Sequence, residues 1–169
     1  MMKQRLVDEI NKQITYEFYS AFLYLSMASY CAENDLPGFE NWFKVQKDEE
    51  EFHATRFLTY LHDRNQHAVI TGFENPPTEF TSLLDALEKS IEHEKFVTGR
   101  INYLMDIAYE EKDYSAVDFL NWFVKEQTEE ENSFNIQRGQ VKLVGDNGPG
   151  LFQLDREAAT RVFTPPVIP

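Results

Sequence analysis

Apolar side chains recur every three or four residues along most of this 169-residue chain, a spacing that predicts amphipathic α-helices. Four long stretches show the pattern, at about 3–33, 38–64, 81–111 and 114–144, and a shorter one follows at about 155–162. At about 1.5 Å per residue, each long stretch would span roughly 40 to 45 Å. Most of the glycines and prolines lie between or after these stretches. We therefore predict an all-α protein.

Residues 65–80 separate the second and third stretches and show no helical periodicity, with Gly72 and Pro76-Pro77 among them. A connection of this length exceeds the short loops of an up-down-up-down bundle. It is long enough to cross a bundle from end to end, so the second and third helices could run parallel. We predict a four-helix bundle with one long crossover and a short C-terminal fifth helix, folded as a single domain over residues 1–169.

Acidic residues interrupt the apolar stripes of all four long helices near their middles. They are Glu17, Glu50, Glu94 and Glu130, and His53 follows Glu50 by one turn on the same stripe. Burying an unpaired carboxylate costs several kcal/mol, so a chain that buries several at one level must neutralise them with a cation. A bound pair of metal ions is the simplest such cation, and these five residues are its candidate ligands.

The Glu50-x-x-His53 pair is the sharpest local motif, because a spacing of three places both side chains on one helical face. The acidic run 48–51 alone would favour a solvated surface, since E-x-x-H often arises by chance. The register favours the core instead, because Phe57 and Leu61 lie on the same stripe. Oxygen-rich ligation with one imidazole suits iron better than structural zinc, which favours thiolates and more histidines.

Dinuclear iron bundles commonly carry two E-x-x-H motifs, but the fourth helix here has Gln127-x-x-Glu130 in that place. Glu50 could bridge two ions, with Glu17 and His53 completing one site. Glu94 and Glu130 would then complete the other. The missing imidazole makes this second ligand set weaker and more exchangeable, which suits a protein through which iron passes.

Composition narrows the partners and the compartment. The formal net charge of −13 argues against a nucleic-acid partner, which needs clustered lysine and arginine. A single cysteine, Cys31, rules out an intramolecular disulfide framework and fits a reducing cytoplasm. The first residues lead into charged positions rather than an apolar run, so we expect no signal peptide, no membrane span and a cytoplasmic location.

The order and spacing of these motifs resemble those of bacterial non-haem ferritins over nearly all 169 residues. The segments that carry the resemblance are 16–20 with Tyr24, 49–53, Glu94 and 126–130. The resemblance implies a ferritin-like bundle and ferroxidase activity, in which two Fe(II) ions react with dioxygen or hydrogen peroxide and move inward as a ferric mineral. It also implies a homo-oligomeric shell of 24 chains with cubic symmetry.

The resemblance also implies roles for single residues. The first iron would be held by Glu17, Glu50 and His53, and the second by Glu50, Glu94 and Glu130, with Gln127 hydrogen-bonded beside it. A third iron site near the pair would use Glu49, Glu126, Glu129 and Glu130. Tyr24 stands where the family has a redox-active tyrosine, although a core tyrosine that satisfies its hydroxyl on a carboxylate is an equally good interpretation.

Some positions depart from related families. Animal ferritins line a three-fold iron channel with acidic residues at the positions of Val117 and Leu120, so iron is expected to enter elsewhere. Bacterioferritins resemble this chain but bind haem through a methionine in the second-helix motif, where this chain has Glu51 and Phe52, so no haem is expected.

Three further residues are expected to have no part in the site. Trp122 could donate an electron, but a packed indole is the preferred interpretation. His93, beside Glu94, is expected to point away from the buried seam, and Cys31 to be packed and inert.

Two other functions stay open. A di-metal oxidase or peroxidase of the rubrerythrin type would store no iron. The missing second E-x-x-H and the lack of a cysteine-rich electron-transfer region count against it. A non-catalytic shell subunit would bind iron oxidised elsewhere, but such a subunit need not keep all five costly buried ligands.

Overall fold

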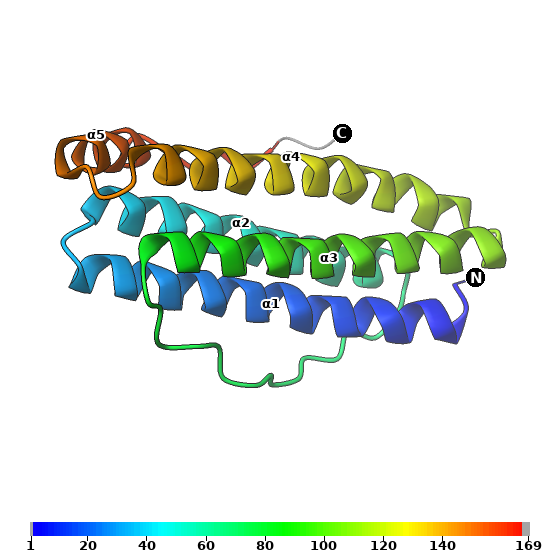
Figure 1. Ribbon diagram of the computed structural model, residues 1–169. Coiled ribbons are helices and arrows are strands. Elements are labelled where there is room, and N and C mark those ends of the chain that lie inside the picture. Colours follow the sequence, from blue (N-terminus) through cyan, green and yellow to red (C-terminus); the bar gives the residue numbers. More distant parts are fainter. Residues whose placement is uncertain (1, 167–169) are drawn as a thin grey trace.

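The structure is a computed structural model that describes residues 2–166 (Figure 1). Its helices are α1 (Gln4–Glu33), α2 (Pro37–Asp63), α3 (Leu83–Glu111), α4 (Tyr114–Val144) and α5 (Gly148–Ala158). The prediction of an all-α bundle is confirmed. Within the described residues, none of the helices carries an apolar stretch long enough to cross a membrane.

The predicted start of the fifth helix was wrong. The helix begins at Gly148 rather than near Asp155. The Asn147 side chain accepts a hydrogen bond from the Gly150 N–H at 3.1 Å, and Pro149 lies in the first turn. Asparagine as a cap followed by proline is a helix-start signal. The glycines around it suggested only a helix end, so this signal was missed.

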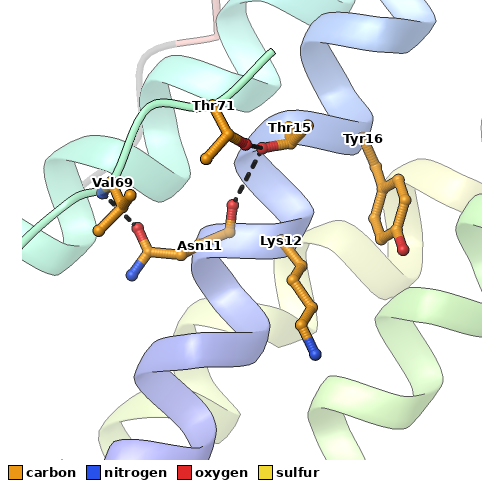
Figure 2. Close-up of a pocket in the computed structure, with 6 residues that line it drawn as sticks. All are labelled: Asn11, Lys12, Thr15, Tyr16, Val69 and Thr71. Carbon is orange, nitrogen blue, oxygen red and sulfur yellow. Dashed lines mark hydrogen bonds between the residues drawn. The ribbon is translucent and has the colours of Figure 1, made fainter. Parts of the chain in front are cut away.

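The long segment between α2 and α3 is the predicted crossover. It runs along α1 from one end of the bundle to the other, and α2 and α3 consequently point the same way (Figure 1). Asn11 of α1 accepts from the Val69 N–H at 2.6 Å, and the Thr15 and Thr71 hydroxyls lie 2.8 Å apart (Figure 2). These hydrogen bonds fasten the segment to the outer side of α1, so it closes neither end of the bundle.

Two apolar clusters fill the bundle, one toward each end. The first includes Ile10 and Ile14 of α1, Phe57 of α2 and Phe123 of α4. The second takes its residues from the opposite ends of the same helices; among them are Tyr24, Phe43, Ile91 and Phe134. Between the clusters each of the four long helices contributes buried polar residues, and we call these the polar layer: Gln13, Glu17, Ser20, Gln46, Glu50, His53, Glu94, Gln127 and Glu130.

Helix α5 closes the bundle end where α2 begins. Asp155 is buried and accepts hydrogen bonds from the Gly38 N–H at 3.0 Å and the Phe39 N–H at 2.9 Å. Asp155 therefore caps a helix to which it does not belong, and its negative charge lies at the positive end of α2. Position 38 must be glycine, because a Cβ there would lie 1.6 Å from the Asp155 carbonyl oxygen.

Replacing Asp155 by alanine should destabilise the protein by about 1 to 2 kcal/mol, since two buried N–H donors lose their acceptor. Urea unfolding of the assembled protein measures the change. The Arg156→Ala variant is the matched control, because Arg156 is the next residue and is exposed. Equal stability of the two variants would contradict the capping role of Asp155.

Candidate metal centre

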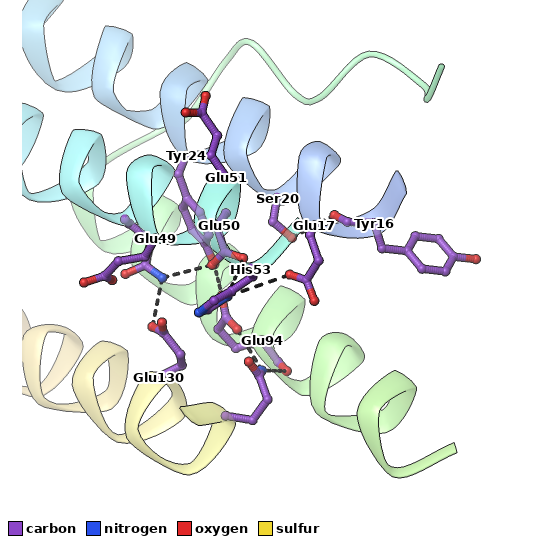
Figure 3. A network of polar contacts seen from close by, with 12 residues as sticks. Tyr16, Glu17, Ser20, Tyr24, Glu49, Glu50, Glu51, His53, Glu94 and Glu130 are labelled. Atoms are coloured by element: carbon purple, nitrogen blue, oxygen red, sulfur yellow. Dashed lines mark hydrogen bonds and ion pairs between the residues drawn. The ribbon is translucent and has the colours of Figure 1, made fainter. Parts of the chain in front are cut away.

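Five ionisable side chains of the polar layer converge from four helices (Figure 3). Glu17 comes from α1, Glu50 and His53 from α2, Glu94 from α3 and Glu130 from α4. None is more than 5% exposed. The apolar clusters on either side therefore hold them away from bulk water, at one level of the bundle.

Glu17, Glu50 and His53 form a fully buried group of possible metal ligands. Each offers a ligand atom within 4.8 Å of the others. His53 Nδ1 lies 3.5 Å from Glu50 Oε2 and 3.9 Å from Glu17 Oε2. Glu17 Oε1 accepts a hydrogen bond from Gln13 Nε2 at 2.8 Å, whereas its buried Oε2 has no hydrogen-bond partner among the described residues.

Glu94 and Glu130 are oriented by amide and hydroxyl donors. The Tyr24 hydroxyl donates to Glu94 Oε1, and Gln127 Nε2 donates to Glu94 Oε2 at 3.0 Å. Gln46 Nε2 donates to Glu130 Oε2 at 2.8 Å and to Glu50 Oε1 at 3.0 Å. Buried amides thus fix the directions of these carboxylates before any ion arrives.

A second group of ligand atoms consists of His53, Glu126 and Glu130, again within 4.8 Å of one another. His53 is common to both groups, so the two share the imidazole at their junction. Glu126 is only half-buried. This second group therefore leads from the buried layer toward the surface of α4.

Three of the four carboxyl groups have a pKa above the usual value of a glutamate. Burial and the neighbouring Glu50 raise the pKa of Glu17 well above its usual value. Burial and Glu50 also raise the pKa of Glu94 to about 8, although the hydrogen bonds from Tyr24 and Gln127 lower it. Burial and the charges of Glu94 and Glu50 raise the pKa of Glu130. Mutual repulsion in a dry layer is the common cause.

Glu50 and His53 behave oppositely and form an ion pair. Burial favours the neutral acid of Glu50, yet the hydrogen bond with His53 and its positive charge hold the pKa of Glu50 below its usual value. Burial would lower the pKa of His53, but Glu50 and Glu17 raise it to about 10. Without a metal ion, the imidazolium is therefore the main counter-charge of the layer.

The donor set fits hard, oxygen-preferring cations. It offers four carboxylates and one imidazole, with no thiolate, a combination that suits ferrous iron rather than a structural zinc site. The unpartnered Oε2 of Glu17 gives the most specific support, because a buried carboxylate oxygen needs a partner. A metal ion beside His53 and Glu50 would supply that partner and replace the protons.

A family model described as the ferritin-like domain matches residues 7–144. This range contains the whole polar layer and most of the chain. The chain belongs to the ferritin family.

Individual ferritins are similar to this chain over nearly its whole length. The bacterial non-heme ferritin of Staphylococcus saprophyticus is 39% identical over 163 residues, covering 96% of this chain and 98% of that one. The Staphylococcus aureus protein of the same name is 36% identical with equal coverage. An open pore ferritin from Archaeoglobus fulgidus superposes with a TM-score of 0.95 at 40% identity, covering 96% of this chain and 100% of that chain. An engineered closed form of that ferritin gives 0.95 at 41%, covering 97% and 100%.

The residues predicted for a third iron site do not all meet in this ferritin chain. Glu126 and Glu130 lie together with His53. Glu49 instead accepts a hydrogen bond from Arg161 Nη2 at 2.5 Å. Glu129 is exposed and belongs to neither group of ligand atoms found among residues 2–166.

His93 does not point away from the bundle, so that prediction was wrong. Its Nε2 lies 2.7 Å from the Ser20 hydroxyl, and its ring centroid lies 6.2 Å from that of Tyr24. The small Ser20 side chain leaves room for the imidazole between α1 and α3. Burial lowers the pKa of His93, so it adds no positive charge beside the layer at neutral pH.

Trp122 and Cys31 match their structural expectations. The Trp122 ring meets the His53 ring edge to face, with centroids 5.5 Å apart, under the Arg56 guanidinium at 4.1 Å. Cys31 is fully buried, and burial raises its thiol pKa to about 12. A thiol in that state is a poor nucleophile and a poor metal ligand.

Sequence reasoning missed the supporting residues Gln13, Gln46 and Arg161. Gln46 lies on the apolar stripe of α2, so its burial could have been inferred from the register that singled out Glu50. Gln13 is likewise one turn before Glu17. Arg161 follows the last helix and contacts residues more than 110 positions earlier, for which no local pattern exists.

Binding of metal at pH 7 should release at least about two protons per chain. Glu94, with a pKa of about 8, and His53, with a pKa of about 10, are largely protonated in the metal-free layer. Metal ions bind carboxylate and neutral imidazole, so these protons must leave. Titration with redox-inert Zn(II) in weak buffer with a pH indicator counts them. Glu94→Gln should release about one proton fewer, and equal release would contradict the assignment.

The same shifts predict how the stability of the metal-free protein depends on pH. Folded Glu94 keeps a proton between about pH 4.5 and 8 that the unfolded chain loses, so stability falls as pH rises through this window. The contribution of His53 is complete below about pH 6.5 and is lost toward pH 10. The melting temperature should therefore fall between about pH 6 and 9, and bound Zn(II) should flatten this dependence. A rise over the same interval would contradict it.

Proposed function

We propose that this ferritin stores iron and oxidises Fe(II) to Fe(III) at the polar layer. One observation carries the proposal: four carboxylates and one imidazole are buried at one level, and one of their oxygens has no hydrogen-bond partner among the described residues. Such a layer is unfavourable unless cations occupy it. The family relationship supports iron as the cation, because the relatives are ferritins.

Each ligand has a distinct role in holding the substrate iron. Glu50 bridges the two ions. Glu17 and His53 complete the first site, which has the imidazole. Glu94 and Glu130 complete the second, and Gln127 orients Glu94 through its 3.0 Å hydrogen bond. Carboxylates stabilise Fe(III) more than Fe(II), so the ligand set lowers the cost of removing an electron from each ion.

Two neighbouring Fe(II) ions match the electron demand of the oxidant. Each ion gives up one electron, and dioxygen takes both electrons and two protons to become hydrogen peroxide. With hydrogen peroxide as the oxidant, the same two electrons break the O–O bond, and two protons taken up from solution complete two water molecules. The shared Glu50 keeps the two ions close enough to deliver both electrons to one oxidant molecule.

Tyr24 acts first as a positioning residue. Its hydroxyl donates to Glu94, and its ring stacks on that of Phe134 with centroids 5.4 Å apart. Burial and the charge of Glu94 raise the pKa of Tyr24 well above its usual value, so it remains a phenol and a donor. Any additional electron transfer from Tyr24 would pass through its hydrogen bond to Glu94, which is a ligand of the second iron.

The assembly is proposed to be a hollow shell of 24 chains in which ferric mineral collects. The net charge of −13 per chain would attract Fe(II) to such a shell. Val117 and Leu120 are buried in the first apolar cluster, so they offer no acidic channel. Iron access is therefore proposed to use a different route from the three-fold channel of animal ferritins.

Aerobic addition of Fe(II) to metal-free protein tests storage directly. Size-exclusion chromatography should then show a very large particle whose peak contains far more iron than the ligands can hold. Uptake that stops at the ligand count, in a small oligomer, would instead establish the rubrerythrin-type oxidase.

Substituting Glu50→Ala should slow the initial oxidation at least about tenfold, because both ions lose a ligand and even outer-shell partners of metals are worth that much. Stopped-flow absorbance of the ferric product measures the rate. Glu51→Ala is the matched control, since Glu51 is the adjacent, exposed carboxylate. Equal rates for the two variants would support a non-catalytic shell subunit.

A further inference from the structure

The chain after α5 turns back along the bundle toward the middle of the long helices (Figure 1), and it contacts α2. Asn41 Nδ2 donates to the Arg161 carbonyl oxygen at 3.0 Å. Farther along, the Phe163 ring meets the Phe52 ring with centroids 5.9 Å apart. We call residues 159–166 the C-terminal strap. It covers the face of α2 that also carries Glu49.

Arg161 is the charged group by which the strap contacts this face. Its Nη2 donates to Glu49 Oε2 at 2.5 Å and to Gln46 Oε1 at 2.8 Å, and its Nη1 donates to the Trp42 carbonyl oxygen at 3.2 Å. The guanidinium also lies 4.3 Å from the centroid of the Trp42 ring. The side chain is only 19% exposed. Several partners therefore hold one cation in one place, unlike a mobile surface ion pair.

The position of this cation bears on the candidate third iron site. Glu49 is one of the four carboxylates proposed for that site, and its Oε2 is already engaged by the guanidinium. A metal ion at Glu49 would meet a fixed positive charge within a few ångströms and would have to replace a charge-assisted hydrogen bond. Arg161 and a third metal ion therefore compete for the same carboxylate.

We propose that Arg161 holds the Glu49 carboxylate in place of a third metal ion, so that the strap limits the chain to the iron pair until Arg161 withdraws from Glu49. This inference rests on the proposed function, because it concerns an ion adjacent to the pair. Arg161 is thus not a metal ligand in this proposal. It limits how many ions the chain binds.

Arg161 also reaches the pair itself through Gln46. A guanidinium can only donate, so it fixes Oε1 of Gln46 toward the strap. The amide nitrogen is thereby directed to Glu50 Oε1 and Glu130 Oε2. Withdrawal of Arg161 would free Glu49 for metal and release the constraint on the Gln46 amide at the same time.

Anaerobic Fe(II) titration of the full-length assembled protein, with bound iron measured after equilibrium dialysis, tests the competition. In Arg161→Met, which keeps an apolar stem on Trp42 but has no charge, the third Fe(II) should bind at least about tenfold more tightly than in the unmodified protein. The affinity for the first two ions should change much less than that for the third, because the Gln46 amide keeps Glu50 and Glu130 as acceptors without the guanidinium. Arg156→Ala removes the same charge from exposed α5 and should leave all three affinities unchanged.

The gain must also depend on Glu49. The double variant Arg161→Met with Glu49→Gln should lose the tighter third binding, because the freed carboxylate is then absent. A gain that persists in the double variant, or no gain in Arg161→Met, would overturn the inference while leaving the iron pair intact. Arg161→Ala provides the same comparison if the methionine variant does not assemble. Failure of the unmodified protein to bind even two ions would instead overturn the proposed function.

Discussion

Repulsion among four buried carboxylates is the constraint on which the rest of this structure depends. Two apolar clusters hold Glu17, Glu50, Glu94 and Glu130 at one level, where water cannot screen their charges. The metal-free chain meets the constraint with protons on three carboxyl groups and an imidazolium at His53. Metal ions can take over this role with better geometry. The affinity for cations is therefore a consequence of the division of the core into two apolar clusters with the polar layer between them.

Three glutamines orient the carboxylates of the polar layer through hydrogen bonds. Gln13 and Gln46 each donate to a glutamate four residues later on their own helix, so Glu17 and Glu50 are oriented by local geometry. The donors to Glu94 and Glu130 come from other helices. The proposed second iron position would consequently depend on how the helices lie against one another. Together with its missing imidazole, this makes it the more adaptable of the two.

Sequence periodicity was sufficient for the parts of the structure that repeat. The register of the long helices predicts which carboxylates are buried, since each interrupts an apolar stripe. The start of α5 and the contacts of Asp155 and Arg161 were not predictable in this way. Asp155 caps the N-terminus of a helix more than 110 residues earlier, and such a pairing exists only after the bundle has formed. The same holds for His93, whose position depends on the small Ser20 across the α1–α3 contact.

Burial decreases from the first group of ligand atoms, Glu17, Glu50 and His53, to the second, His53, Glu126 and Glu130. Glu17 and Glu50 are 1% and 2% exposed and Glu130 is 5% exposed. Glu126 is half-buried, and Glu129 is exposed. An ion that moves from the first group of ligand atoms to the second therefore regains hydration, which favours Fe(III) more strongly than Fe(II) because hydration increases steeply with charge. Under the proposed function, oxidation would therefore bias iron toward Glu126. Arg161 lies beside Glu49, where we propose that its positive charge opposes a third ion.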